Sequence, residues 1–217
     1  MKKVVQAYKL YFSDKTFTLA YALSLFMLIA SVVLNVYAGI YAGEKASSPV
    51  TDIVLSNIRV YDVDLIFIYG PLLFWVFVGV WLLLHPHRVP FTLKSIALFV
   101  FIRSFFVVLT HIGPFPGDLL TSDGRFIRWF MSGGDLFFSA HTGLPFLLAL
   151  LFWRERWLRY FFLASAVFFG VVVLLGHFHY SIDVLAAFFI TYAIVDLAKF
   201  FFPRDLVHFL TTPSAEG

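Results

Sequence analysis

Two short clusters of polar residues contain the groups that phosphoryl chemistry needs: Ser139-Ala140-His141-Thr142 and His179-Tyr180-Ser181-Ile182-Asp183. Each cluster lies at the end of a long apolar run. Ionisable groups are costly in a bilayer unless they are paired or used, so their presence is a functional indication. Two histidines and a carboxylate are suited to making and breaking a phosphorus–oxygen bond at a membrane surface.

The spacing of His179 and Asp183 indicates a nucleophile held by a carboxylate. Residues four apart share one face of a helix, so Asp183 can bind one ring nitrogen of His179 and leave the other free to attack phosphorus. His141 can then protonate the leaving alkoxide and later accept a proton from the hydroxyl that receives the phosphoryl group. Two other interpretations remain open: Asp183 as a helix cap, and a metal site formed by His177, His179 and Asp183.

The charge on the phosphoryl oxygens also needs partners. Hydroxyl groups, backbone N–H groups at a helix start and a nearby arginine can supply them. Gly133-Gly134-Asp135 permits a tight turn close to a phosphate, and Arg103 must be paired or face a polar cavity because it lies inside an apolar run. Arg125 and Arg128 stand three apart in an aromatic segment, where they either anchor the chain at headgroup depth or form a phosphate clamp. We therefore predict that substrate is bound by Asp135, Ser139, Thr142, Arg103, Arg125 and Arg128.

Composition predicts an all-α polytopic membrane protein. Hydrophobic residues make up 61% of the 217 residues and charged residues only 13%, whereas soluble domains contain about 25% charged residues. Six runs reach or approach the length of about 20 residues that a membrane span requires, and they lie near 17–41, 64–84, 92–112, 136–153, 160–177 and 181–202. We expect a six-transmembrane-helix bundle over 17–202, with an N-terminal segment 1–16 and a tail 203–217. The first run is too long for a typical signal peptide, so we expect it to be retained.

The distribution of basic residues predicts that both termini are cytoplasmic. In this topology, basic residues concentrate on one side of the membrane: Lys2, Lys3, Lys9, Lys15, Arg88, Lys94, Arg154, Arg156, Arg159, Lys199 and Arg204. The other side holds Lys45, Arg59, Arg125 and Arg128. By the positive-inside rule the first group is cytoplasmic, so segment 1–16 and tail 203–217 are predicted to be cytoplasmic. The two histidine clusters then share the extracytoplasmic face of an up-and-down bundle.

At these residues the chain resembles the sphingomyelin synthase family, a branch of the type 2 phosphatidic acid phosphatase superfamily. That family has Gly-Asp-x-x-x-Ser-Gly-His-Thr followed by His-Tyr-Thr-Ile-Asp-Val, and this chain has Gly134-Asp135-Leu136-Phe137-Phe138-Ser139-Ala140-His141-Thr142 and His179-Tyr180-Ser181-Ile182-Asp183-Val184. The stretch that begins at Arg103 and continues to Pro114 and Pro116 is similar to a third conserved region. The resemblance covers about residues 95–195.

The resemblance implies transfer of a phospho-headgroup from a glycerophospholipid to a lipid alcohol such as ceramide, on the extracytoplasmic leaflet. It implies a His–His–Asp centre of His141, His179 and Asp183, with His179 as nucleophile and His141 as acid and base. Donor and acceptor would both be membrane lipids, and we expect no cofactor, no metal and no nucleic-acid partner.

Departures from the related phosphatases favour a transferase. Phosphatases of the superfamily carry a Lys-x₆-Arg-Pro element, whereas Lys94 and Arg103 are separated by eight residues and no proline follows the arginine. They also have an arginine shortly before the nucleophilic histidine, and Val171 to Gly176 contains no basic residue. A lipid phosphate phosphatase with water as acceptor is the alternative, and a non-catalytic transporter or scaffold is a third.

Overall fold

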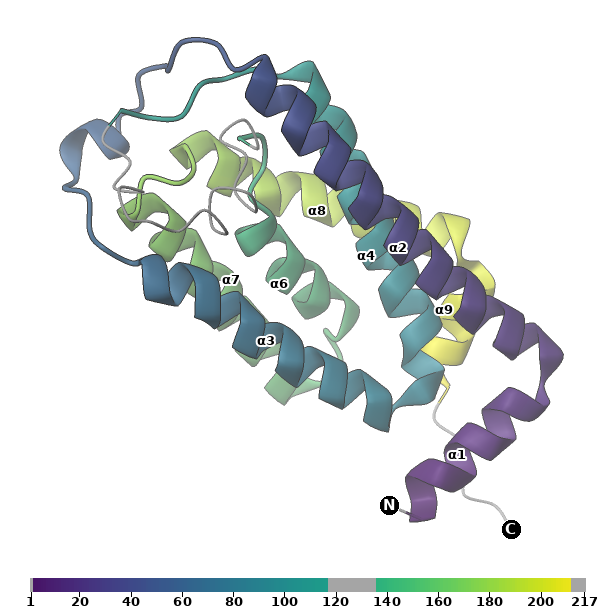
Figure 1. The fold of residues 1–217 in the computed structure, drawn as a ribbon. Coiled ribbons are helices and arrows are strands. Elements are labelled where there is room, and N and C mark those ends of the chain that lie inside the picture. Colours follow the sequence, from purple (N-terminus) through teal and green to yellow (C-terminus); the bar gives the residue numbers. More distant parts are fainter. Residues whose placement is uncertain (1, 117–135, 212–217) are drawn as a thin grey trace.

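The computed structural model describes residues 2–116 and 136–211, and these residues form helices and no strand (Figure 1). The long helices are α2 (Lys15–Glu44), α3 (Asp64–Leu84), α4 (Val89–Leu109), α7 (Arg156–Leu175) and α8 (Ser181–Phe201). The shorter ones are α1 (Lys2–Ser13), α6 (Ala140–Leu151), α9 (Pro203–Leu210) and the 3₁₀ turns η1 (Leu55–Asn57) and η2 (Pro86–Arg88). The all-helical prediction is confirmed for the described part of the chain.

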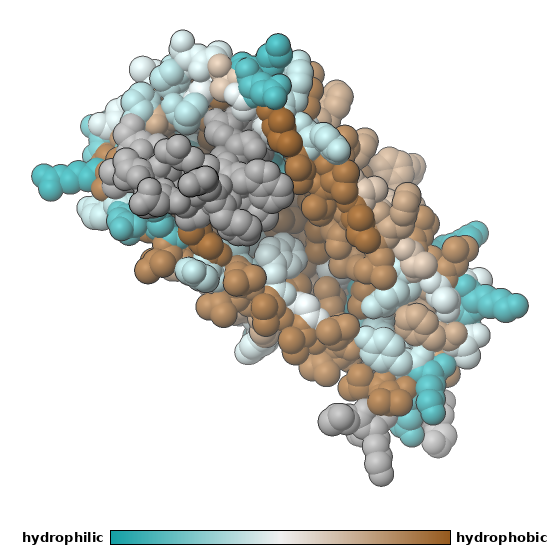
Figure 2. Space-filling model, viewed as in Figure 1, coloured by the Kyte–Doolittle hydropathy of each residue, from teal (hydrophilic) through white to brown (hydrophobic). Residues whose placement is uncertain are grey.

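Five helices are long and apolar enough to cross a bilayer, namely α2, α3, α4 with its preceding turn, α7 and α8. Many of their large apolar side chains face outward: Leu19 is 70% exposed, Leu65 71% and Phe189 78%. Figure 2 shows hydrophobic residues along the length of the bundle, with the most hydrophilic residues at its two ends. Such a surface suits lipid rather than water, and it is that of a multi-pass membrane protein.

The fourth predicted span, 136–153, contains a shorter helix than expected. Helix α6 has 12 residues, which is about 18 Å at 1.5 Å per residue and well short of the roughly 30 Å hydrocarbon core. The chain enters α6 through Phe138, whose φ is 27°, and through an extended Ser139. Residues 136–139 therefore precede the helix instead of forming its first turn, and a set of six full-length spans is not found in the described residues.

Helix packing places α6 in the interior of the bundle. Helix α2 packs along α4, while α6 packs against α7 and α8 (Figure 1). The approach of α6 to α4 depends on Gly143, where a Cβ would lie 2.6 Å from the Phe99 ring. Phe99, Leu147 and Leu148 are fully buried here. The result is a rigid support beneath the first turn of α6.

The two ends of the helix bundle differ in which helices they contain. We call the N-terminal ends of α6 and α8, with the C-terminal end of α7, the site end. Helices α1 and α9 lie at the opposite end (Figure 1), where the Lys94 ammonium lies 2.6 Å from a carboxylate oxygen of Asp205 and both residues are buried. Neither α1 nor α9 was predicted from the sequence. The placement of the termini relative to the two membrane faces stays a prediction.

Candidate active site

The start of helix α8 forms the first part of the site. His177 has a left-handed φ of 57°, which turns the chain out of α7, and Tyr180 is the N-cap of α8. Asp183 is the third residue of the helix, and its carboxylate accepts a hydrogen bond from the Tyr180 backbone N–H at 3.0 Å. This contact satisfies a backbone donor that the helix start would otherwise leave unpaired. The interpretation of Asp183 as part of a helix cap is therefore confirmed.

The same carboxylate oxygen of Asp183 lies 3.2 Å from Nδ1 of His179. Asp183 is 0% exposed and His179 is 6% exposed, so water does not compete strongly for this contact. An ionised carboxylate only accepts hydrogen bonds, so this contact favours the tautomer in which Nδ1 carries the proton and Nε2 has the lone pair. The contact expected from the i, i+4 spacing is present.

The start of helix α6 forms the second part of the site. The Ser139 backbone N–H donates to the Asp183 carbonyl at 3.1 Å, which ties the first turn of α6 to the first turn of α8. His141 follows two residues later, in the first turn of α6. The Phe67 ring of α3 packs on the His141 ring with centroids 4.4 Å apart. Contacts among helices α3, α6 and α8 thus hold both histidines at the site end.

Arg103 is buried and bound at the edge of this arrangement. Its Nε donates to the Phe138 carbonyl at 3.1 Å, and another guanidinium nitrogen donates to the side-chain oxygen of Asn35 at 3.1 Å. The hydroxyl of Ser104 donates to the same Asn35 oxygen at 3.3 Å. The expectation that Arg103 is paired is confirmed. Its guanidinium holds the backbone directly before Ser139, and Asn35 is a partner that the sequence analysis missed.

Several buried polar atoms at the site have no hydrogen-bond partner among the described residues. These are Oγ of Ser139, Oγ1 of Thr142 and the second carboxylate oxygen of Asp183. Thr142 lies against Gly170 of α7, where a Cβ would be 3.3 Å from the threonine hydroxyl. A buried polar atom without a partner costs roughly 1–3 kcal/mol. These three oxygens therefore have unused hydrogen-bonding capacity within the described residues.

Asp52 supports the α8 turn and was also missed from the sequence. One of its carboxylate oxygens accepts from the Ser181 backbone N–H at 2.7 Å, and the other accepts from Val54 and Leu55 at 2.8 and 3.0 Å. Burial acts to raise the pKa of Asp52, but the hydrogen bonds from Leu55, Ser181 and Val54 outweigh it and lower the pKa. A carboxylate from the α2–α3 connection thus binds the first residue of α8.

Tyr180 joins the same turn to two other connections. Its hydroxyl donates to the Gly113 carbonyl at 2.8 Å and accepts from the Val50 backbone N–H at 3.2 Å. Gly113 is required at this point, because a Cβ there would lie 2.1 Å from a backbone oxygen of Ser47. The connection that precedes α3 and the segment that follows α4 therefore both bind Tyr180, the residue next to His179.

The structure does not support the metal interpretation. The His177 ring packs edge-on against Phe115 with centroids 5.3 Å apart. Within residues 2–116 and 136–211, no three His, Cys, Asp or Glu side chains are arranged to hold a metal ion. Of the predicted substrate-binding residues, Asp135, Arg125 and Arg128 lie outside the described residues.

Lys94 lies away from the site. It pairs with Asp205 at the opposite end of the bundle, and Arg103 follows it by nine positions along α4, a rise of about 13.5 Å. Lys94 is thus bound to Asp205 while Arg103 is bound to Phe138 and Asn35, which agrees with the absence of the phosphatase spacing from the sequence.

Fold and site together define a multi-pass helical membrane protein with a His–Asp pair and a second histidine at one end. In a comparison with protein families, the PAP2 superfamily C-terminal model matches residues 132–200. This part of the chain is therefore similar to that superfamily. It covers both histidine clusters. No curated protein and no solved structure matches the chain.

Proposed function

We propose that this protein is a sphingomyelin synthase-like phosphotransferase, which moves a phospho-headgroup from a glycerophospholipid to a lipid alcohol such as ceramide or diacylglycerol. One observation carries the proposal: the Ser139–Asp183 backbone hydrogen bond joins the turn that bears His141 to the His179–Asp183 pair. The contact between the Asp183 carboxylate and Nδ1 of His179 supports His179 as the nucleophile.

In the first step, the Nε2 lone pair of His179 attacks the phosphorus of the donor. A nitrogen–phosphorus bond forms, the phosphorus–oxygen bond to diacylglycerol breaks, and the leaving oxygen takes a proton from His141. Asp183 stabilises the positive charge that develops on the His179 ring. Ser139 and Thr142 are placed to donate hydrogen bonds to the phosphoryl oxygens.

In the second step, the acceptor hydroxyl gives its proton to neutral His141 and its oxygen attacks the phosphohistidine. The nitrogen–phosphorus bond breaks, and both histidines return to their starting states. If water replaces the lipid alcohol, the same steps make the enzyme a phosphatase. We favour a lipid acceptor because Lys94, the basic residue nearest to the phosphatase spacing, is paired with Asp205 away from the site. From the positive-inside rule we expect this site on the extracytoplasmic face.

The reaction can be tested with purified protein in liposomes that contain headgroup-labelled phosphatidylcholine or phosphatidylethanolamine. Ceramide, diacylglycerol or no acceptor is added, and phosphatidate is supplied separately. We expect labelled headgroup on the acceptor lipid. Release of phosphate from phosphatidate without headgroup transfer would reject the transferase in favour of the phosphatase, and no turnover of any lipid would reject both.

The roles of the two histidines can be separated with a second donor. His179→Ala should abolish both transfer and acid-labile labelling of the protein by the donor. His141→Ala should slow lipid turnover by roughly 10²–10⁴-fold, the usual contribution of a general acid. It should still be labelled by a nitrophenyl ester of the headgroup, because nitrophenolate leaves without a proton. His208→Ala, a histidine of α9 at the opposite end, is the matched control.

A further inference from the structure

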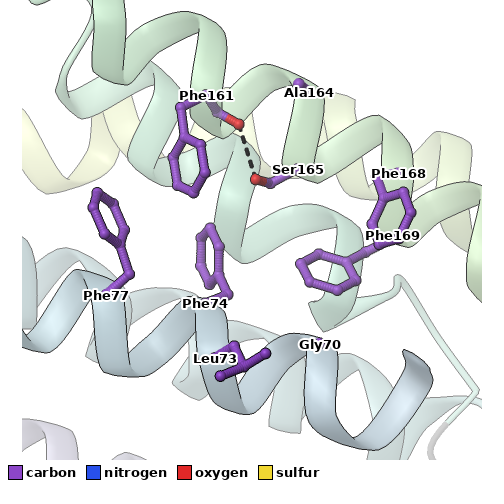
Figure 3. Close-up of a pocket in the computed structure, with 9 residues that line it drawn as sticks. All are labelled: Gly70, Leu73, Phe74, Phe77, Phe161, Ala164, Ser165, Phe168 and Phe169. Atoms are coloured by element: carbon purple, nitrogen blue, oxygen red, sulfur yellow. Dashed lines mark hydrogen bonds between the residues drawn. The ribbon is translucent and has the colours of Figure 1, made fainter. Parts of the chain in front are cut away.

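A groove of about 490 Å³ runs between helices α3 and α7 (Figure 3). Its lining consists of Gly70, Leu73, Phe74, Phe77, Phe161, Ala164, Ser165, Phe168 and Phe169. Ser165 is the one polar side chain in this lining, and its hydroxyl donates to the Phe161 carbonyl at 2.8 Å. The lining residues therefore present an almost purely hydrocarbon surface.

The groove lies at membrane depth and opens outward. Both of its helices are candidate spans, and the residues from Gly70 to Phe77 cover about 10 Å along α3. Leu73 is 70% exposed and Phe168 is 51% exposed at its rim. The Phe77 and Phe161 rings meet edge to face with centroids 4.8 Å apart, on the side away from the site. In a bilayer this groove faces lipid chains, so its occupant is hydrocarbon.

The other end of the groove adjoins the candidate active site. Phe67 lies one turn before Gly70 on α3 and contacts the His141 ring. On α7, Phe169 lines the groove and the next residue, Gly170, lies against Thr142. The two walls of the groove thus continue directly into residues that contact the site.

We propose that this groove binds an acyl chain of the phospholipid donor while its headgroup lies at His141 and His179. This inference rests on the proposed function. A chain that leaves the bilayer for an apolar groove gains little hydrophobic free energy, because lipid is already apolar. Binding of the chain in the groove instead orients the donor, because a chain held beside Phe67 directs the phosphate toward the histidines.

Filling the groove should weaken this orientation. Ala164→Phe adds a ring at an exposed lining position without disturbing the core, and Leu73→Trp does so from the opposite wall. Gly79→Phe is the matched control. Gly79 lies nine residues, or two and a half turns, after Gly70 and so on the opposite face of α3, and a Cβ there meets no atom within 4 Å.

Kinetics with two donors provide the first measurement. For a long-chain donor we expect both groove variants to raise KM about tenfold or more, while Gly79→Phe leaves it unchanged. The nitrophenyl ester of the same headgroup has no acyl chain, so all variants should turn it over like the wild type. Equal loss with both donors, or an unchanged KM for the long-chain donor, would overturn the proposal.

Photolabelling provides a measurement that does not depend on turnover. A phosphatidylcholine with a diazirine in one acyl chain should label peptides that contain residues 70–77 and 161–169, and Ala164→Phe should remove this label. Uniform labelling that includes the Gly79 face would show ordinary surrounding lipid and reject the groove. Groove labelling without headgroup transfer or hydrolysis would support the binding site and reject the proposed function.

Discussion

Replacing Lys94 by methionine tests whether this basic residue stabilises the fold or acts in the candidate active site. The substitution leaves the Asp205 carboxylate without its partner, where the two side chains are only 6% and 8% exposed. Removing one member of a buried ion pair costs about 3–5 kcal/mol, whereas replacing both by uncharged groups is often neutral. Lys94→Met should therefore be much less stable than Lys94→Met combined with Asp205→Leu.

Thermal unfolding of the purified protein measures this difference. A change of 1 kcal/mol shifts Tm by about 2–4 °C in a chain of this size, so Lys94→Met should unfold about 6–20 °C below the wild type. The double variant should recover most of that loss. At a temperature where both variants are folded, lipid turnover should match the wild type, because Lys94 lies away from the histidines.

Two results would refute this reasoning. A double variant as unstable as Lys94→Met would show that the ion pair is not what the single variant loses. A Lys94→Met protein that is folded but inactive would show that Lys94 serves the site. The second result would also restore the phosphatase interpretation.

Two further predictions concern the supports of the site. Because hydrogen bonds lower the pKa of Asp52 below its ordinary value of 3.8, its stabilising effect is complete above that value and is lost as the pH falls through the lower folded-state pKa. Wild-type Tm should therefore fall more steeply than that of Asp52→Asn between pH 4 and pH 2, and parallel pH curves would contradict this. Gly143→Ala places a methyl group against Phe99 and should cost about 1–3 kcal/mol by overpacking. Gly79→Ala meets open space and should be neutral or slightly stabilising, so equal losses in denaturant melts would contradict the packing argument.

Long apolar runs and local spacing were predictable from the sequence. The bounds of α3, 64–84, are the predicted ones, because an uninterrupted apolar run has no competing structure in a membrane. The His179–Asp183 contact was predictable because it lies within one helical turn. Both predictions need only neighbouring residues.

The features that the sequence did not reveal depend on distant residues or on short amphipathic segments. Asp52 and Ser181 are 129 residues apart in sequence, and Asn35 and Arg103 are 68 apart. No local sequence pattern indicates contacts between residues so far apart in the chain. Helices α1 and α9 contain too many polar residues to be found by a search for apolar runs, and α6 starts late because Phe138 adopts a backbone conformation that hydropathy does not report.

Asp183 performs its two tasks with different atoms. Its main-chain oxygen fastens the α6 turn, while its side chain orients His179 and caps α8. Exchange of the side chain leaves the main-chain oxygen in place. The main-chain contact between α6 and α8 therefore does not depend on the identity of the side chain at position 183, whereas the orientation of the His179 ring and the cap of α8 do.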